Sequence, residues 1–437
     1  MIRSFKFIDL FSGLGGFHLA ASSLGGSCVF ASEINECLHD VYEQNYGIRP
    51  YGDLRLVDPA LIPDHDLLCA GFPCQPFSKA GGQKGWRDTV RGTLFFNIAQ
   101  IIELKRPSFV ILENVANFLK HDGGNTYRQV ISALHELGYQ VNASKLSPHL
   151  FGVPQHRERM FIVAFRGSLD GFSWPAPTYE LTDIAQVLDD LPAPSKPTPP
   201  HVIDCLEVWQ QLLDALPQDV EIPSYPLWSM EFGATYPLEK PVHKLRVKDL
   251  QQYRGSFGVS LEGMSRAEIY KNLPSHALRE SGFPRWKIRF ITNNRKFFED
   301  NKLVIEPWLE KVKIFHSSLQ KLEWNDKGGE RNVWSHMVQA RASGLRIKKT
   351  AYSPALVAAS DSQIPIIGWK KRYLSVRECA RLQSMDSLVM PESIYDAYEA
   401  LGNAVNVHLV TLIMQKLLMA VDDFELHIRP ANMAVSV

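Results

Sequence analysis

The 437-residue chain has no net charge, few cysteines and no long apolar run, and each shortage excludes a class of protein. Its six cysteines form neither a C-x-x-C pair nor the spacing of a zinc site, so no metal is expected. No apolar run approaches the ~18 residues that span a bilayer, and the first six residues lack the apolar core of a signal peptide. We therefore expect a cytoplasmic protein with reduced thiols and no membrane association.

The neutral total hides an uneven distribution of charge. Residues 241–350 hold 22 lysines and arginines against 11 aspartates and glutamates, a net charge of +11 that the rest of the chain balances with −11. A basic block inside an acidic body is typical of a lobe that binds a polyanion. A solvated lysine-rich face is the alternative interpretation.

The N-terminal part alternates apolar strands with helical stretches. Residues 6–11 predict a strand that runs into the glycine turn 12–16 and then a helix, the first unit of a nucleotide-binding α/β fold. This order predicts an α/β domain with a doubly wound, mostly parallel sheet. Further strands are expected at 27–32, 66–70, 107–112 and 159–164, with helices at 93–103 and 127–137.

The alternation stops after Phe165. Seven prolines accumulate between residues 174 and 200, where we expect a linker. The stretch from there to about residue 365 is rich in aromatic and basic residues and predicts a second, irregular lobe. From Tyr373 the pattern becomes regular again, and an apolar helix at 404–421 should return to cover the first strand.

One short loop carries a candidate nucleophile. Cys74 stands between Pro73 and Pro76, directly after the strand at 66–70, and the prolines make the loop stiff. Ligands bind at the carboxyl ends of the strands in such a sheet, where a cysteine can act as a nucleophile. A buried structural cysteine is the alternative for this loop taken alone.

A glycine turn suggests a nucleotide-like cofactor. Gly13, Gly15 and Gly16 allow a ligand to approach the backbone closely. Glu33, 20 residues beyond Gly13, is placed to bind ribose hydroxyls, and the pattern fits NAD, FAD or S-adenosylmethionine (SAM). Asp53 could accept a hydrogen bond from an adenine amino group, or simply stabilise a turn.

Three charged residues should share the sheet edge with Cys74. Glu113 ends the strand at 107–112, where burial would raise the pKa of its carboxyl and let the protonated form donate to a ring nitrogen. Arg157 and Arg159 alternate on an extended segment and so point to the same side. They could hold a carbonyl oxygen, a phosphate or the nearby carboxylates.

Together these motifs make the chain similar to the DNA (cytosine-5) methyltransferases of restriction–modification systems. The match covers about residues 5–166 and 345–420, and it omits most of the basic block, which corresponds to the family's variable target-recognition region. The motifs recur in the family's order: 9–16 (Asp-Leu-Phe-Ser-Gly-Leu-Gly-Gly), 71–78 (Gly-Phe-Pro-Cys-Gln-Pro-Phe-Ser), 91–95, 113–115, 155–159, 375–383 and 402–405.

The resemblance implies transfer of a methyl group from SAM to C5 of a cytosine flipped out of duplex DNA, leaving S-adenosylhomocysteine. Cys74 would add as a thiolate to C6 and thereby make C5 nucleophilic. Glu113 would protonate or hydrogen-bond N3, and Arg159, with Arg157, would bind the O2 carbonyl. No residue is an obvious acceptor for the C5 proton, so water is the candidate.

The resemblance also implies two sets of binding residues. Those expected to line the SAM site are Phe11, Gly13, Leu14, Gly16, Glu33, Asp53, Pro73, Leu94 and Asn403. Those expected to contact DNA are Ser78 and Lys79 after the catalytic cysteine and, in the basic block, Arg254, Arg285, Lys287, Arg289 and Arg295.

The same resemblance implies the division of the chain. A catalytic SAM-binding domain is expected at 1–185, a target-recognition domain at 186–365 and a C-terminal segment at 366–437 that completes the catalytic domain. Family members often carry a Thr-Leu pair where this chain has Ala355-Leu356, so Leu356 should keep the packing role while any hydrogen bond of the threonine is absent.

Double-stranded DNA and a restriction endonuclease acting on the same site are the expected partners of a monomer in the prokaryotic cytoplasm. Methylation of tRNA is an alternative, because one branch of the family does this with a small recognition region. About 200 residues between Phe165 and Tyr373 favour DNA. A non-catalytic DNA-binding module is disfavoured by the complete set of motif residues, and a Rossmann oxidoreductase by the later motifs.

Overall fold

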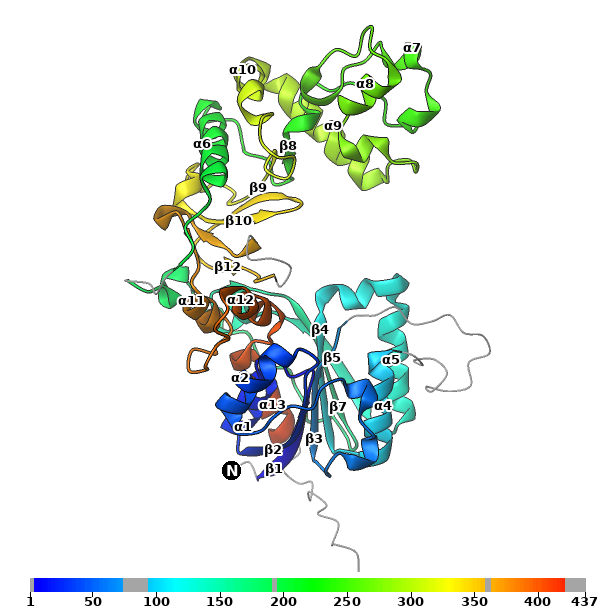
Figure 1. Cartoon of the computed structure of the whole chain (residues 1–437), viewed down its shortest axis with the longest axis vertical. Coiled ribbons are helices and arrows are strands. Elements are labelled where there is room, and N and C mark those ends of the chain that lie inside the picture. Colours follow the sequence, from blue (N-terminus) through cyan, green and yellow to red (C-terminus); the bar gives the residue numbers. More distant parts are fainter. Residues whose placement is uncertain (1–3, 74–92, 191–194, 358–362, 421–437) are drawn as a thin grey trace, which may run out of the picture. The chain divides into compact units, whose positions relative to one another are not determined.

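The chain folds into two compact units (Figure 1). The computed structural model describes residues 4–73, 93–190, 195–357 and 363–420. The first unit comprises Met1–Asp189, Ala355–Asp361 and Val376–Val437, and the second comprises Asp190–Pro354 and Ser362–Ser375.

The first unit is built on a six-stranded sheet with the order β2-β1-β3-β4-β7-β5. Strand β7 alone runs against its neighbours, and the other pairings are parallel. This confirms the predicted doubly wound, mostly parallel sheet. Its strands are β1 (Phe5–Leu10), β2 (Gly26–Ser32), β3 (Leu67–Gly71), β4 (Phe109–Val115), β5 (Gln140–Leu146) and β7 (Arg159–Phe165); the short β6 (Gln155–His156) precedes β7.

The central strands are apolar because both of their faces are buried. Leu67 to Ala70 of β3 and Phe109 to Leu112 of β4 are each at most 4% exposed. Strand β5 was not predicted, since its residues alternate between exposed and half-buried positions and form no apolar run.

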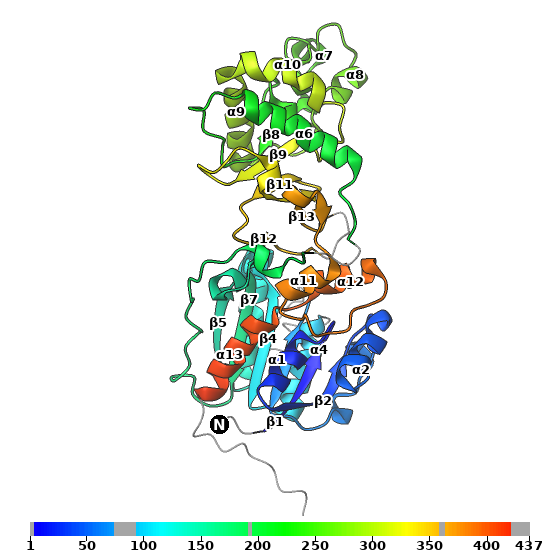
Figure 2. The same ribbon diagram turned by 90° about the vertical axis from the view of Figure 1, so that its left-hand side faces the viewer.

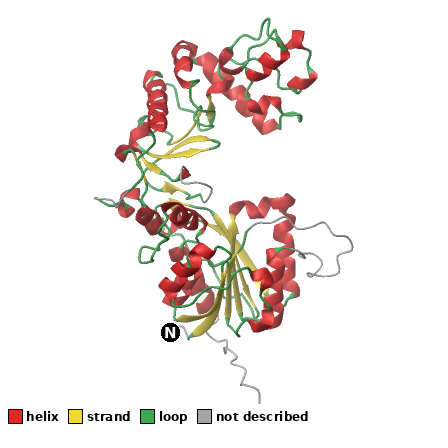
Figure 3. Ribbon diagram, in the orientation of Figure 1, coloured by secondary structure: helices red, strands yellow, loops and turns green. Residues whose placement is uncertain are grey.

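Helices cover both faces of this sheet. Figure 1 shows α4 and α5 on one face and α1 and α13 on the other, and Figure 3 shows the strands in yellow between red helices. The helices of this unit are α1 (Gly16–Ser23), α2 (His39–Tyr46), α4 (Leu94–Lys105), α5 (Asn125–Glu136), α11 (Val376–Leu382), α12 (Ile394–Asn403) and α13 (Val407–Met419).

The C-terminal helix completes the core of the first unit, as the sequence predicted. Helix α13 packs against α1 (Figure 2), and its residues Leu409, Val410, Ile413 and Met414 are at most 1% exposed. The helix begins three residues later than expected, because Asn406 caps it by accepting a hydrogen bond from the Leu409 amide.

The second unit contains a second six-stranded sheet with the order β14-β13-β10-β11-β9-β8. Its strands are β8 (Leu227–Trp228), β9 (Lys321–Asn325), β10 (Met337–Arg341), β11 (Gly344–Lys348), β13 (Ile366–Ile367) and β14 (Arg372–Tyr373), with the short β12 (Ser353–Pro354) before β13. Its helices are α6 (Pro200–Ala215), α7 (Val247–Leu250), α8 (Arg266–Lys271), α9 (Arg285–Asp300) and α10 (Lys302–Val312).

Two expectations about this unit were wrong. It is not irregular throughout, but its strands have only two to five residues, too few to produce a clear alternation in the sequence. The chain also returns to the first unit later than the predicted boundary at residue 366. A first, short return is Ala355–Asp361, but strands β13 and β14 pair with each other in the second sheet, so the final return begins only at Val376.

The turn before α1 generates a prediction about stability. Gly15 has a φ of +77°, and a Cβ there would overlap the Tyr46 ring. That ring is stacked on His18 and its hydroxyl donates to the carbonyls of Leu14 and Gly15, so it cannot move aside easily. We expect Gly15→Ala to lower the free energy of unfolding by about 1 to 3 kcal/mol more than a substitution without this overlap.

Gly25→Ala is the matched control, because Gly25 also has a positive φ, +88°, but faces open space. Urea unfolding of both variants measures the difference. Equal destabilisation would show that backbone strain alone limits position 15 and that the Tyr46 contact does not matter.

Candidate active site

A cavity of 530 Å³ lies at the carboxyl ends of the parallel strands in the first unit. The structure brings to its wall eight of the nine residues predicted to bind SAM, and their binding role stays a prediction. They are Phe11, Gly13, Gly16, Glu33, Asp53, Pro73, Leu94 and Asn403. Glu113, Arg157 and Arg159 line the same cavity. The ninth residue, Leu14, does not line it, because its side chain is buried at 2% exposure.

Two backbone amides hold the Glu33 carboxylate in place. The Gly13 amide donates to Oε2 at 2.8 Å and the Asn35 amide donates to Oε1 at 2.8 Å. Each carboxylate oxygen can accept more than one hydrogen bond, so both retain capacity for a ligand. Gly13 itself has a φ of +54°, and the space where its Cβ would be is open.

The backbone is strained where β1 enters the glycine turn. Phe11, a wall residue of the cavity, has a φ of +56°, a conformation that costs about 1 to 3 kcal/mol in a residue other than glycine. Two residues earlier, on β1, Asp9 is fully buried. Its Oδ2 accepts a hydrogen bond from the Tyr42 hydroxyl at 3.2 Å, while its Oδ1 has no partner among the described residues. Burial raises the pKa of Asp9 well above its usual value.

Asp53 has a local partner in the free protein. Its carboxylate accepts from the Arg55 guanidinium at 2.9 Å and from the Arg55 amide at 2.9 Å. This matches the turn-stabilising alternative for Asp53. An adenine amino group would have to share the carboxylate with Arg55.

Glu113 and Arg159 form an ion pair at the cavity wall. Arg159 Nε donates to Glu113 Oε1 at 3.0 Å, and both side chains are largely buried. They meet because β4 and β7 are antiparallel neighbours whose register places Val115 opposite Arg159. Burial raises the pKa of the Glu113 carboxyl, against the opposing charges of Arg159 and Arg157. The carboxyl therefore holds its proton to a higher pH than an exposed glutamate does, which favours a role as proton donor.

The end of β3 lies beside this pair. Gly71 is registered opposite Glu113, and a Cβ at Gly71 would come within 3.6 Å of Glu113 Oε2. Asn114 Nδ2 donates to the Phe72 carbonyl at 2.8 Å and thereby fixes the start of the Pro-Cys loop. The sequence had placed Asn114 in a motif without a role. Cys74 itself lies outside the described residues, as do the predicted DNA contacts Ser78 and Lys79.

Arg157 uses most of its donors within the first unit, and only its Nε lacks an acceptor among the described residues, so its contact with a substrate stays a prediction. Arg157 is 1% exposed, and its guanidinium donates to the carbonyls of Leu356 at 3.0 Å, Gly402 at 2.7 Å and Ala404 at 2.9 Å. It therefore positions the segments on either side of Asn403. Leu356 is 2% exposed and packs as expected.

Of the DNA contacts predicted in the basic block, three are exposed and two are not. Arg254, Arg285 and Arg289 are exposed, the last two on α9. Lys287, on the same helix, is 7% exposed and lies about 6 Å from the rings of Trp228 and Phe283. Burial, with the nearby charges of Arg279 and Lys321, lowers the pKa of Lys287.

Three of the five N–H groups of Arg295 are used inside the second unit. Its Nε and Nη2 donate to Glu231 Oε2 at 3.2 and 3.1 Å, and its Nη1 donates to the Tyr236 carbonyl at 2.9 Å. Glu231 is fully buried and also binds Tyr236 and His276. A buried carboxylate without such donors would be costly, so Arg295 has a structural role here, and its DNA contact stays a prediction that would have to use the remaining N–H groups.

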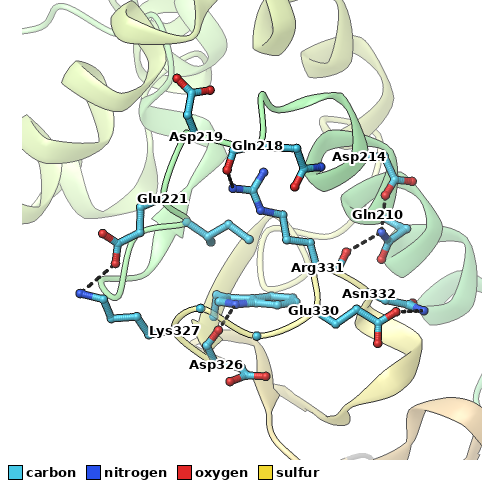
Figure 4. Close-up of a pocket in the computed structure, with 14 residues that line it drawn as sticks. Gln210, Asp214, Gln218, Asp219, Glu221, Asp326, Lys327, Glu330, Arg331 and Asn332 are labelled. Atoms are coloured by element: carbon cyan, nitrogen blue, oxygen red, sulfur yellow. Dashed lines mark hydrogen bonds and ion pairs between the residues drawn. The ribbon is translucent and has the colours of Figure 1, made fainter.

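A larger hollow of 840 Å³ lies in the second unit (Figure 4). Acidic and amide side chains dominate its wall, and Arg331 donates from it to the carbonyls of Pro217 and Gln218. None of the predicted catalytic residues lines it, so the 530 Å³ cavity is the candidate active site. Within the described ranges, no group of three potential metal ligands gathers and no helix is long and apolar enough to cross a membrane.

The Arg157 contacts predict that its loss loosens the segment around Asn403. Arg157→Met keeps the length of the side chain but leaves three carbonyls without their donor, which should lower the free energy of unfolding by about 2 to 4 kcal/mol. Hydrogen exchange should become faster at residues 400–406. Arg49→Met is the control, because Arg49 pairs only with exposed carboxylates and should leave this exchange unchanged. Slow exchange at 400–406 in both variants would contradict the positioning role.

Comparison with known proteins identifies the family. Residues 5–213 and 236–419 match the model of the C-5 cytosine-specific DNA methylases. The chain is 46% identical over 205 residues to the type II methyltransferase M.HhaI of Haemophilus parahaemolyticus, an alignment that covers 46% of this chain and 61% of the relative. It is 30% identical to the type II methyltransferase M.AluI of Cellulosimicrobium cellulans over 490 positions, covering 94% and 91%.

Several alignments are partial, and the chain spans 44% of M.MspI of a Moraxella species at 44% identity. Similarity to the crystal structure of another protein supports the fold of this chain but not its function. The structure is that of a prophage-encoded E. coli protein to which DNA modification methyltransferase activity is ascribed, with a TM-score of 0.52 at 18% identity and coverage of 95% of this chain and 99% of the other. The family match extends over both units, and this chain belongs to the C-5 cytosine-specific DNA methylase family.

Proposed function

We propose that this protein methylates C5 of a specific cytosine in duplex DNA with SAM as the methyl donor. The observation that carries the proposal is the Glu113–Arg159 pair, held at the wall of the cavity beside the strand end that leads to Cys74. A carboxyl of raised pKa next to a guanidinium offers a proton donor and a carbonyl ligand on one side of a planar ring. Cytosine presents N3 and O2 in this arrangement.

The residues of the cavity fit SAM. Glu33, oriented by two amides, offers oxygens to the ribose hydroxyls. The open space above Gly13 admits a close ligand, and the side chains of Phe11 and Leu94 supply apolar wall for an adenine ring. When bound, SAM would supply an electrophilic methyl group. Asn403 would be held against it by the Arg157 contacts on either side.

Each catalytic side chain has a separate task. The Cys74 thiolate would add to C6 of the cytosine, which breaks the aromaticity of the ring and makes C5 nucleophilic. The electron density that reaches N3 would be met by the protonated Glu113 carboxyl, and Arg159 would hold O2. Because the pair is largely buried, these hydrogen bonds would act with little competition from water.

The second unit favours DNA over tRNA as the substrate. It extends through Asp190–Pro354 and carries exposed arginines at 254, 285 and 289. Phosphate contacts from such residues could offset the few kcal/mol, roughly, that base flipping costs. By analogy with its relatives, which are named type II methyltransferases, we also infer a partner endonuclease for the same sequence and a monomeric enzyme in the prokaryotic cytoplasm.

Incubation with labelled SAM tests the substrate directly. We expect label in duplex DNA and none in tRNA. The Cys74→Ser variant should not transfer the methyl group, because a neutral hydroxyl is far less nucleophilic than a thiolate. Bisulfite sequencing of the product then gives the methylated sequence. Label in tRNA alone would refute the DNA substrate, and an active Cys74→Ser variant would refute the nucleophile.

Glu113→Gln separates catalysis from stability. The rate of methyl transfer should fall about 10²- to 10⁴-fold, because an amide cannot supply the proton. The raised pKa means that burial disfavours the ionised carboxyl, so wild-type stability relative to the Gln variant is greatest below the unfolded-state pKa of about 4.3 and declines as pH rises through the folded-state pKa. Thermal midpoints of both proteins at pH 5 and pH 8 measure this. A Gln variant less stable at pH 8 than at pH 5, relative to wild type, would contradict it.

A further inference from the structure

The second sheet has one apolar and one polar face. On the first face, Leu322, Leu345, Ile347 and Val338 are fully buried. The neighbouring positions on β9, β10 and β11 point to the other side, because side chains alternate along a strand. The charged residues on that side are Lys321, Glu323, Arg341, Arg346 and Lys348, and we call them the polar face. Asn325, Met337 and Gln339 share this side, and Met337 and Gln339 are buried. Within these three strands, Glu323 is the only acidic residue.

Glu323 is saturated by its neighbours. Oε1 accepts from Arg346 Nε at 3.1 Å and from Asn325 at 3.0 Å, while Oε2 accepts from Arg346 Nη2 at 3.2 Å and from Arg341 Nη2 at 2.6 Å. Burial opposes its charge, but the Asn325 hydrogen bond and the Arg346 charge outweigh this and hold the pKa of Glu323 below its usual value. The carboxylate therefore orients the arginines and has no capacity left for another donor.

Arg346 keeps one edge free. The carboxylate occupies the edge formed by Nε and Nη2, and no described residue accepts a hydrogen bond from Nη1. The terminal edge, with one N–H from Nη1 and one from Nη2, thus points its two parallel donors away from Glu323. The side chain is 28% exposed. Two parallel donors match the O6 and N7 acceptors of guanine in the major groove.

The Arg295–Glu231 pair is a useful contrast within the same unit. It has the same bidentate contact, but Arg295 Nη1 is used by the Tyr236 carbonyl and Glu231 is fully buried. The two pairs thus differ in which N–H donors of the guanidinium group remain without an acceptor. Nη1 of Arg295 already donates to a carbonyl, whereas Nη1 of Arg346 has no acceptor among the described residues.

Unpaired lysines flank this edge. Lys348 lies 5.0 Å from the Tyr352 ring, and burial, with the nearby charge of Arg346, lowers its pKa to about 8. Lys321 lies 5.9 Å from the Trp228 ring and makes no ion pair with a described residue. A crowded group of cations with one saturated carboxylate is complementary to a polyanion.

We propose that Arg346 is a specificity-determining residue that recognises a guanine of the target sequence, and that Glu323 is its positioning residue. The inference rests on the proposed function. A target with a cytosine always contains guanine on the complementary strand, so every recognition sequence supplies such a base. Because Arg346 is already fixed by Glu323, little side-chain freedom is lost when it binds.

The test uses the full-length enzyme and the sequence found by bisulfite sequencing. Each guanine of the site is replaced in turn by 7-deazaguanine, which lacks the N7 acceptor. Wild-type kcat/KM should fall about 10- to 100-fold for one of these substrates. Arg346→Ala should show a comparable loss on unmodified DNA and no further loss with that analogue. Arg346→Lys, which keeps the charge but loses the fork, should behave in the same way.

Glu323→Gln tests the positioning role. It should raise KM and reduce the discrimination between the correct site and one with that guanine replaced, with kcat nearly unchanged. Glu323→Asp should restore part of the discrimination. Arg289→Ala is the control, because an exposed phosphate contact should weaken all substrates equally and lower the salt dependence of binding by about 0.9 per contact.

The outcomes are distinct. Equal sensitivity of wild type and Arg346→Ala to every 7-deazaguanine would overturn the guanine assignment. A salt slope lowered by Arg346→Ala without any analogue effect would make Arg346 a phosphate contact and also overturn it. Absence of methylation from duplex DNA in wild type would instead overturn the proposed function.

Discussion

The buried guanidinium of Arg157 is the constraint on which the first unit depends. Three carbonyls from Leu356, Gly402 and Ala404 converge on it, although they lie about 200 to 250 positions further along the chain. Asn403 lies between two of these anchors on the wall of the cavity, and Glu113 supplies an opposite charge that favours the charged guanidinium. The cavity therefore has a fixed wall built from the end of the chain, which local secondary structure alone could not provide.

Desolvation gives the site its chemistry. The same burial that excludes water from Glu113 and Arg159 also raises the pKa of the carboxyl and strengthens the contact between the two side chains. The same unit also holds a left-handed backbone conformation at Phe11 and a buried oxygen, Asp9 Oδ1, with no partner among the described residues. Such local violations of folding rules are usual where a protein must keep a ligand site open.

Local patterns made much of the first unit predictable. Glu113 and the glycine turn each follow an apolar strand. Because parallel strands run in the same direction, their carboxyl ends meet at one edge of the sheet, so both features could be placed there. Arg157 could not be separated from Arg159 in this way, because its partners are distant in the sequence. In the second unit, the sequence shows only that Arg295 and Arg346 both belong to the basic block at residues 241–350. Only the long-range pairing with Glu231 and Glu323 shows how many donors each of them has to spare, and strands of two to five residues left no pattern to find.

The points at which the chain leaves and re-enters the first unit have an evolutionary consequence. The longer insertion, Asp190–Pro354, begins after Asp189, which pairs with Arg381, and it ends next to the Leu356 carbonyl that Arg157 holds. A shorter insertion spans Ser362–Ser375. Since both ends of the longer insertion are anchored by contacts within the first unit, segments of other lengths and sequences can be exchanged there without rebuilding the catalytic core. Recombination at the two ends of the longer insertion could therefore replace most of the second unit in one event and leave the residues around the 530 Å³ cavity unchanged.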